Sequence, residues 1–182
     1  MAASLSGKSA SQWVQDWRRP APAQPAQRRT PSRWVRFRKT QVIVPDLNLL
    51  VYAHSDGSPL HEPARQWWEE SVNGAERIGL PWIVTAGFVR LLTHPSVLIQ
   101  PATPEGALDL VAEWFRSPNV VPLNPGGQHL ELFRQALASA GVGGNLVTDA
   151  HIAAVAIENQ AEVHSNDPDF ARFPGLRWRN PL

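Results

Sequence analysis

The chain has 182 residues, and 43% of them are hydrophobic, which is enough for one domain with an ordinary core. It contains no cysteine, so disulfide bonds and thiolate metal sites are excluded. No apolar run approaches the roughly 20 residues that a membrane span requires, and the N-terminus lacks the apolar segment of a secretory signal. We therefore expect a cytoplasmic protein that does not associate with a membrane.

The net charge of +1 hides two segments of opposite sign. Residues 1–41 contain nine basic residues and one acidic residue, a net charge of +8. Residues 42–182 contain eight basic and fifteen acidic residues, a net charge of −7. The first segment also has a proline-rich stretch and no sustained apolar period, so we predict a disordered N-terminal extension over 1–41.

Two roles remain open for this basic extension. Its arginines are interleaved with Trp13, Trp17 and Trp34, and such a mixture can bind phosphates and stack on bases. Alternatively, the segment has no specific role, or the natural start lies near Val42, where the first strand begins. The native N-terminus, measured by mass spectrometry, distinguishes these alternatives.

From residue 42 onward, short apolar runs alternate with segments of helical period, which is typical of a parallel sheet covered by helices. Thr103 is a suitable N-cap, and the glycines at 141–144 are a suitable helix stop. We predict an α/β domain over 42–182, with a central twisted parallel sheet of four to five strands flanked by helices. The apolar strand segments are 42–45, 78–80, 119–122, 161–164 and 176–178, and the helices are 47–54, 60–72, 82–93, 103–116, 127–140 and 146–158.

Three carboxylates lie at the junctions between these elements. Asp46 ends the first strand, Asp149 lies in the first turns of the alanine-rich helix, and Asp167 follows the strand at 161–164. In an open α/β sheet, residues just past the carboxyl ends of the strands line the ligand crevice. Carboxylates gathered there repel one another unless a cation holds them, and oxygen ligands favour Mg²⁺ or Mn²⁺. The pattern favours metal-assisted phosphoryl chemistry.

Each of these carboxylates also has a structural interpretation. Asp46 could simply cap the helix that follows it, and Asp149 could be an exposed residue that favours the helix dipole. Asp167 and Asp169 bracket a proline, which is ordinary turn chemistry. Asn48 could orient the site or a water molecule, or be a turn residue. Ser165 could donate a hydrogen bond to a carboxylate or a phosphate.

Other kinds of site are not indicated. The six histidines show no metal-ligand spacing, so we expect surface or core-edge roles for them. No nucleophile elbow, P-loop or dinucleotide-binding glycine fingerprint is present. We place four tryptophans on apolar helix faces and predict that they belong to the core: Trp67, Trp68, Trp82 and Trp114.

Residues 42–182 resemble the PIN-domain ribonucleases, specifically the VapC-type toxins of bacterial toxin–antitoxin pairs. The tail at 176–182, Leu-Arg-Trp-Arg-Asn-Pro-Leu, is similar to that of the actinobacterial branch. The other stretches that carry the resemblance are 42–53, 81–95, 144–154 and 165–175.

The resemblance implies acidic residues that hold Mg²⁺ or Mn²⁺ and an RNA-cleaving activity. Asp46, Asp149 and Asp167 match three of the family's acids, and Asp169 is a less regular fourth. The family's remaining acid, a Glu in the middle helix, is replaced here by Gly87. This departure favours one tightly held ion over two.

Two further residues of the middle helix are candidates for the site. Arg90 and Thr93 lie one and two helical turns beyond Gly87 and could contact phosphate. The alternative for Arg90 is a salt bridge or a side chain that lies along the surface with its charge in water. Local steering of RNA could also come from Arg172, Arg177 and Arg179, or from the basic extension.

We therefore predict a Mg²⁺-dependent endoribonuclease with RNA as its substrate. The resemblance implies a VapB-type antitoxin as partner and a homodimer, with Trp67 and Trp68 available for partner contacts if they are exposed. Two other functions remain open. One is a catalytically inactive PIN-like binding module, caused by the loss of the Glu at Gly87; the other is a structure-specific DNA nuclease, which competition between RNA and DNA would reveal.

Overall fold

A five-stranded, fully parallel sheet forms the centre of the molecule, in the order β3-β2-β1-β4-β5. The structure is a computed structural model that describes residues 41–98, 100–141, 144 and 146–182. The predicted extension at 1–41 lies outside the described residues except for Gln41. The strands are β1 (Val42–Pro45), β2 (Arg77–Pro81), β3 (Val120–Leu123), β4 (Glu162–His164) and β5 (Arg177–Arg179).

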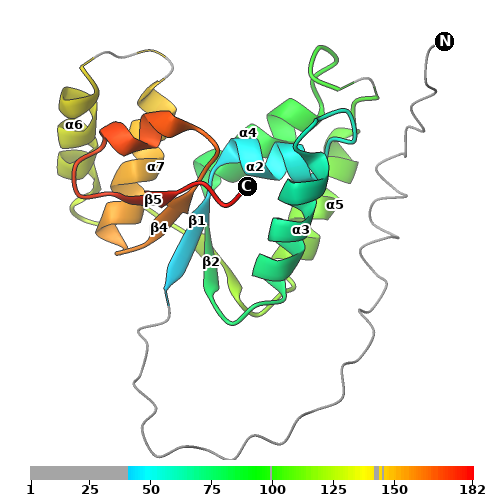
Figure 1. Cartoon of the computed structure of the whole chain (residues 1–182), viewed down its shortest axis with the longest axis horizontal. Helices are drawn as coiled ribbons and strands as arrows, with labels where there is room; N and C mark the ends of the chain where they lie inside the picture. Colours follow the sequence, from blue (N-terminus) through cyan, green and yellow to red (C-terminus); the bar gives the residue numbers. More distant parts are fainter. Residues whose placement is uncertain (1–40, 99, 142–143, 145) are drawn as a thin grey trace, which may run out of the picture.

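Helices cover the sheet in two groups. In Figure 1, α6 and α7 lie together on one side of the strands, and α2 to α5 lie together on the other. This arrangement confirms the predicted α/β class. The helices are α2 (Leu47–Ala53), α3 (His61–Val72), α4 (Trp82–Leu92), α5 (Pro104–Trp114), α6 (His129–Ala140) and α7 (Leu146–Glu158), with a short 3-10 helix η1 (Pro168–Arg172). Within the described part of the chain, no helix has both the length and the apolar character to cross a bilayer.

The sequence of each strand fits its position in the sheet. The central strand β1 buries Ile43 and Val44 almost completely, as a strand covered by helices on both faces must. Edge strand β3 carries Pro122, which has no backbone N–H to donate and is tolerated at an edge. The central strand β1 is thus apolar throughout, and its carboxyl end leads directly into Asp46.

Small side chains bring α7 close to the sheet. Ala150, Ala153 and Ala156 are completely buried, and none of them holds the helix away from its neighbours. The preceding helix α6 ends at Gly141, whose φ of 76° lies in the left-handed region that favours glycine. The predicted glycine stop is therefore confirmed, and α7 begins its first turn beside the carboxyl ends of β1 and β4.

The predicted elements are found within two residues of their expected ends, and η1 is an additional element. Trp67, Trp68 and Trp114 are buried, as predicted, which makes the partner-contact alternative for Trp67 and Trp68 wrong. The prediction for Trp82 is also wrong, because its side chain is 56% exposed. Trp82 occupies the first position of α4 and packs only partly, against Phe115, with ring centroids 6.0 Å apart.

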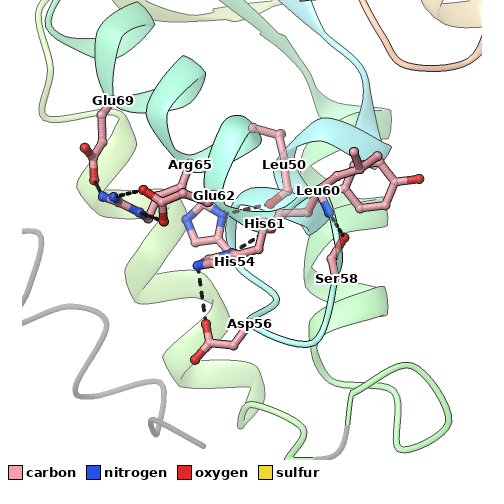
Figure 2. Close-up of polar contacts among 10 residues, drawn as sticks. Leu50, His54, Asp56, Ser58, Leu60, His61, Glu62, Arg65 and Glu69 are labelled. Carbon is pink, nitrogen blue, oxygen red and sulfur yellow. Dashed lines mark hydrogen bonds and ion pairs between the residues drawn. The ribbon is translucent and has the colours of Figure 1, made fainter. Parts of the chain in front are cut away.

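A set of polar contacts fixes the connection between α2 and α3, shown in Figure 2. His54 Nδ1–H donates to the carbonyl oxygen of Leu50 at 2.8 Å, and His61 Nδ1–H donates to the carbonyl oxygen of Tyr52 at 2.9 Å. His54 also lies against Phe88 and Trp114 in the core. The histidine at this junction is thus part of the core packing, consistent with the core-edge role expected for it.

Candidate active site

The carboxyl ends of β1 and β4 meet at one edge of the sheet. The two strands pair in parallel with Val44 opposite Val163 and Pro45 opposite His164. The backbone N–H of Asp46 continues this pairing by donating to the carbonyl oxygen of His164 at 2.9 Å. Residues 46 and 165 therefore leave the sheet side by side, although they are 119 positions apart in the chain.

Ser165 is the hydrogen-bonding centre of this edge. Its buried hydroxyl donates to Asp46 Oδ2 at 2.7 Å. The Ser165 hydroxyl oxygen also accepts from the backbone N–H of Asp167 at 2.9 Å and from the side-chain amide of Asn48 at 3.2 Å. A hydroxyl has one proton and two acceptor positions, so these three bonds use its full capacity. Ser165 thus holds three of the predicted site residues in one network.

Asp46 is both a helix cap and a member of this network. Its Oδ1 accepts from the backbone N–H of Leu47 at 2.7 Å, at the start of α2. Its side chain is only 6% exposed, and this burial raises the pKa of Asp46 to about 6. The hydrogen bonds from Ser165 and Leu47 act in the opposite direction, and the charge of Asp167 adds to the rise. The capping interpretation is therefore correct but incomplete.

Asp149 is held over the same edge by the first turns of α7. It is half-buried, and burial is the largest cause that raises its pKa to about 6. The charges of Asp46, Asp167 and Asp169 raise that pKa further, in this order. Asp46, Asp167 and Asp169 therefore all lie close enough to Asp149 for their charges to act on it. Asp149 does lie in the first turn of α7, as the structural interpretation expected, but it is half-buried rather than exposed.

Asp167 and Asp169 belong to the turn that leads into η1. Asp167 Oδ1 accepts from the backbone N–H of Asp169 at 2.9 Å, and Asp167 is the N-cap of η1. Asp169 Oδ1 lies 3.4 Å from the guanidinium of Arg172, which also donates to the carbonyl oxygen of Ala140 at 2.9 Å. Turn chemistry and proximity to the other carboxylates therefore coexist here.

The ligand atoms at this edge suit a hard cation. Every candidate ligand is a carboxylate or amide oxygen, the type that Mg²⁺ and Mn²⁺ prefer. Asn48 Oδ1 is buried and has no hydrogen-bond partner among the described residues, which is unusual for a buried acceptor and leaves it available. Within the described residues, no three acidic or histidine side chains already converge on one metal position. Carboxylates that repel one another separate, and a cation would draw them together.

The middle helix contributes less to this edge than the sequence indicated. Thr93 is the C-cap of α4, and its hydroxyl donates to the carbonyl oxygen of Val89 at 2.9 Å. Arg90 is exposed, and within the described part of the chain its guanidinium makes no ion pair. No described hydrogen bond or ion pair joins either residue to the four carboxylates. The predicted salt bridge of Arg90 is not found among the described residues.

Gly87 lies where α4 approaches α2. A Cβ atom at this position would be 2.9 Å from Leu47 Cδ2, closer than such contacts normally are. Leu47 follows Asp46 directly, so the absence of a side chain at Gly87 permits close packing next to the acidic edge. We use this name for the edge of the sheet that carries Asp46, Asp149, Asp167 and Asp169. The departure from the family pattern at Gly87 thus has a packing consequence here.

Sequence reasoning missed a network of side-chain contacts next to this edge, formed by Trp67, His164 and Glu162. Trp67 Nε1 lies 3.2 Å from His164 Nδ1, and an indole N–H can only donate, so Nδ1 accepts. Nε2 of the same ring lies 3.2 Å from Glu162 Oε1 and 3.1 Å from the donor Nε of Arg179. Burial, followed by the charge of Arg179, lowers the pKa of His164 to about 4, so the ring is neutral. Trp67 and His164 are 97 positions apart, and no local pattern connects them.

Comparison with known proteins agrees with this arrangement. The model of the PIN domain family matches residues 43–176. Ribonuclease VapC33 of Mycobacterium tuberculosis is 44% identical over 141 residues, covering 78% of this chain and 99% of that protein. Ribonuclease VapC37 of the same organism is 40% identical over 136 residues, covering 75% of this chain and 94% of that protein.

Solved structures show the same fold. VapBC2 from Rickettsia felis, bound to a DNA fragment from its promoter, matches with a TM-score of 0.55 and 21% identity, over 77% of this chain and 98% of the matched chain. DNA-bound VapBC from Salmonella typhimurium matches with a TM-score of 0.56 and 19% identity, over 78% and 99%. The family match and the close relatives together show that the chain belongs to the PIN-domain family, among the VapC ribonucleases.

Proposed function

We propose that this chain is a Mg²⁺-dependent endoribonuclease that acts as the toxin of a toxin–antitoxin pair. Asp46, Asp149 and Asp167 are its proposed catalytic and metal-binding residues. The observation that carries this proposal is the joint rise of the pKa values of Asp46 and Asp149 to about 6 in a cluster of four carboxylates. Clustered acids with strongly shifted pKa values are typical of functional sites. The membership in the VapC ribonucleases supports the choice of RNA.

The residues of the proposed site have two roles: some would bind the cation, and others would support the residues that bind it. Asp46, Asp149 and Asp167 would hold the cation, with Asn48 Oδ1 as a neutral oxygen that no hydrogen bond occupies. When bound, Mg²⁺ or Mn²⁺ would increase the nucleophilicity of water and stabilise charge on the phosphoryl oxygens. Ser165 would keep Asp46 in place, because it donates to one carboxylate oxygen and is itself fixed by Asn48 and Asp167. Asp169 would assist through its charge and its pairing with Arg172.

We assign the role of proton acceptor to Asp149. Within the described residues no hydrogen bond occupies its carboxylate, whereas Asp46 accepts from Leu47 and Ser165 and Asp167 accepts from Asp169. Its pKa of about 6 is also closer to neutrality than that of an ordinary Asp. Asp149 is therefore the carboxylate best able to take a proton from the attacking water as the phosphodiester bond is cleaved.

The test is incubation of purified, antitoxin-free protein with total bacterial RNA, in Mg²⁺ or in EDTA. Asp149→Asn should abolish cleavage while the circular dichroism spectrum stays native. Asp109→Asn is the matched control, because Asp109 is an exposed carboxylate on α5 and should keep full activity. Discrete fragments that require both Mg²⁺ and Asp149 support the proposal. Cleavage that persists in EDTA, or in a folded Asp149→Asn protein, contradicts it.

One observation favours a second candidate, an inactive binding module. The family's middle-helix Glu is absent, and Gly87 instead allows Leu47 to pack closely beside Asp46. In that case the folded protein would bind RNA without cleaving it at any Mg²⁺ concentration. The same incubation distinguishes the two candidates, because an inactive module gives no Mg²⁺-dependent fragments even when the protein is folded and free of antitoxin.

The proposal extends to partners. The matched Rickettsia and Salmonella structures are VapBC complexes, which supports a VapB-type antitoxin that covers the acidic edge. Exposed apolar side chains on α4 and α5 support a homodimer: Trp82 and Leu108 are 56% and 55% exposed, and the ring of Trp82 lies 6.0 Å from that of Phe115, the C-cap of α5. Light scattering should show a dimer for the native chain and a monomer for the double variant Trp82→Ser, Leu108→Ser. A native monomer contradicts the dimer.

A further inference from the structure

Residues 177–182 border the acidic edge, although they contribute no carboxylate to it. They begin with β5, an edge strand that pairs in parallel with β4, so that His164 lies opposite Arg179. The pairing extends one residue beyond β4, because the backbone N–H of Ser165 donates to the carbonyl oxygen of Arg179 at 3.1 Å. The segment therefore holds the residue whose hydroxyl is the hydrogen-bonding centre of the acidic edge.

Trp178 holds the other backbone group of Ser165. Its indole N–H donates to the carbonyl oxygen of Ser165 at 3.2 Å, and its ring is partly buried against the core. The N–H and the C=O of Ser165 are thus both bonded to β5, while its hydroxyl bonds the side chain of Asp46. A shift of residue 165 would therefore break bonds on both of its sides.

Asn180 holds the next residue along the chain. Its side-chain amide donates to Asn166 Oδ1 at 2.9 Å, and its own Oδ1 accepts from the backbone N–H of Leu182 at 3.1 Å. Leu182 is partly buried and packs against the core. Since Asn166 stands between Ser165 and Asp167, this contact joins the acidic edge to a segment that is itself anchored.

The loop at 165–167 needs such support. It lies between β4 and η1, in neither a strand nor a helix, so sheet pairing alone does not hold it. Besides burial, the charge of Asp167 raises the pKa of both Asp46 and Asp149, so these carboxylates repel one another. Ligands that are already held near their bound arrangement lose less freedom when a cation binds. Contacts that limit the movement of this loop therefore favour cation binding.

We propose that Trp178 and Asn180 are positioning residues of the acidic edge, and this inference rests on the proposed metal-dependent function. Trp178 acts through the backbone of Ser165. Asn180 acts through the side chain of Asn166. Both keep the loop at 165–167 near the arrangement that binds a divalent cation, and partners of this kind affect metal affinity although they are not ligands.

The test is isothermal titration calorimetry of Mn²⁺ into metal-free protein at pH 7.5, which needs no RNA. Trp178→Phe keeps a ring but removes the N–H that bonds Ser165. Asn180→Ala removes an exposed amide, and it keeps the assay decisive if the first variant does not fold. The matched controls are Trp114→Phe, in the core beside α3 and α4, and Asn73→Ala, at the end of α3.

Each positioning variant should weaken Mn²⁺ binding by roughly three- to tenfold, which is the loss expected from one neutral hydrogen bond. Both controls should keep the native Kd for Mn²⁺, even if Trp114→Phe lowers the melting temperature. Native Mn²⁺ affinity in both positioning variants would overturn the inference. A similar loss of affinity in Trp114→Phe would also overturn it, because general stability would then set the affinity.

A double-mutant cycle tests the route from Asn180 to the loop. Asn166→Ala and Asn180→Ala should each weaken Mn²⁺ binding by a similar factor, and the double variant should lose no more than either single variant, because both remove the same contact. Additive losses would show that Asn180 does not act through Asn166 and would contradict its assignment.

Cleavage assays separate this inference from the proposed function. In both positioning variants, the Mn²⁺ concentration for half-maximal RNA cleavage should rise by the same factor as the Kd, while the KM for RNA at saturating Mn²⁺ stays native. If the native protein cleaves no RNA but the variants still bind Mn²⁺ more weakly, the ribonuclease proposal fails and the positioning role stands. If the KM for RNA rises while the Mn²⁺ affinity is native, Trp178 and Asn180 contact the substrate instead, and the inference is wrong.

Discussion

Two regions of the protein, the α2–α3 junction and the acidic edge, each bury a titratable side chain, His54 and Asp46, and burial shifts the two pKa values in opposite directions. At the α2–α3 junction, burial lowers the pKa of His54 to about 4, so the ring is neutral. That ring contacts the Leu50 carbonyl oxygen at 2.8 Å and packs on Phe88 and Trp114 (Figure 2). At the acidic edge, burial raises the pKa of Asp46 to about 6, which still leaves a charged carboxylate at neutral pH.

The difference lies in what surrounds each group. His54 loses its charge and gains aromatic neighbours, so its burial is compatible with a stable core. Asp46 has Asp167 as a charged neighbour, and Asp149 is surrounded by three further acids. A buried acidic cluster of this kind reduces stability unless a cation is bound. The histidine junction therefore stabilises the fold. The acidic edge instead lowers the stability of the metal-free protein, which is the pattern expected of a functional site.

The largest expected effect is on activity at the acidic edge. Asp149→Asn should lower kcat for RNA by at least about 1,000-fold, because it removes a proposed cation ligand and proton acceptor together. Ser165→Ala should have a smaller effect, about 10- to 100-fold, because Ser165 only positions Asp46. Single-turnover cleavage rates at saturating Mg²⁺ measure both. Equal losses in the two variants would contradict the division of roles.

The next effect is on stability as a function of pH in metal-free protein. The pKa of Asp46 is 3.8 before folding shifts it and about 6 in the folded chain, so the folded state binds more protons between these values. The free energy of unfolding should therefore fall as the pH rises from about 4 to 6, with Asp46 contributing about 3 kcal/mol. Asp149 shifts in the same direction.

Urea denaturation in EDTA at a series of pH values measures this dependence. Asp46→Asn should remove much of the slope and make the metal-free protein more stable at pH 7.5. Saturating Mg²⁺ should also flatten the slope in the native chain. A stability that rises steadily from pH 4 to 6 in EDTA would show that other groups dominate and that the acidic edge is not strained.

A change at the histidine junction should have the opposite pattern. His54→Phe keeps an aromatic ring against Phe88 and Trp114 but loses the contact with the Leu50 carbonyl oxygen. We expect a loss of about 1–2 kcal/mol in the free energy of unfolding and an unchanged kcat at a temperature where the protein is folded. A large fall in kcat without unfolding would place His54 in the active site and erase the contrast between the two regions.

The smallest expected effect is at Gly87, between the two regions. In Gly87→Ala, the new methyl would be 2.9 Å from the end of the Leu47 side chain, which can move. The better helix propensity of Ala offsets this crowding by about 1 kcal/mol, so stability should change by less than about 1 kcal/mol. Gly87→Glu should instead add a metal ligand and raise the number of Mn²⁺ ions bound per chain. No change in stoichiometry would show that position 87 does not reach the site.

Much of the fold and of the acidic site could be predicted from sequence. The apolar strand runs, the alanine-rich helix and the carboxylates that follow the strands carry local signals, and parallel pairing then brings the strand ends together. Other features depend on contacts between distant segments. Trp67 and His164 are 97 positions apart, and Asp46 and Ser165 are 119 positions apart, so no local spacing indicates either pair.

Trp82, which the sequence analysis placed wrongly in the core, also shows that local sequence does not determine contacts between distant segments. Trp82 lies on a helix with an apolar sequence, and periodicity predicts a core position for it. It lies at the first position of α4, where Phe115 packs against its ring but 56% of the residue stays exposed. Exposure at a helix end depends on what packs beside it, which the sequence of the helix alone does not contain. For Arg90, an exposed side chain without an ion pair among the described residues argues only against the salt-bridge alternative, and a contact with phosphate stays a prediction.

The most direct measurement is isothermal titration calorimetry of Mn²⁺ into metal-free protein at pH 7.5, paired with RNA cleavage over the same Mn²⁺ concentrations. The account predicts one ion per chain, cleavage that rises in proportion to the occupied fraction, and loss of both in Asp149→Asn but not in Asp109→Asn. Cleavage without bound Mn²⁺, or Mn²⁺ binding that Asp149→Asn leaves unchanged, would contradict the claim that the acidic edge is the metal-dependent site of RNA hydrolysis.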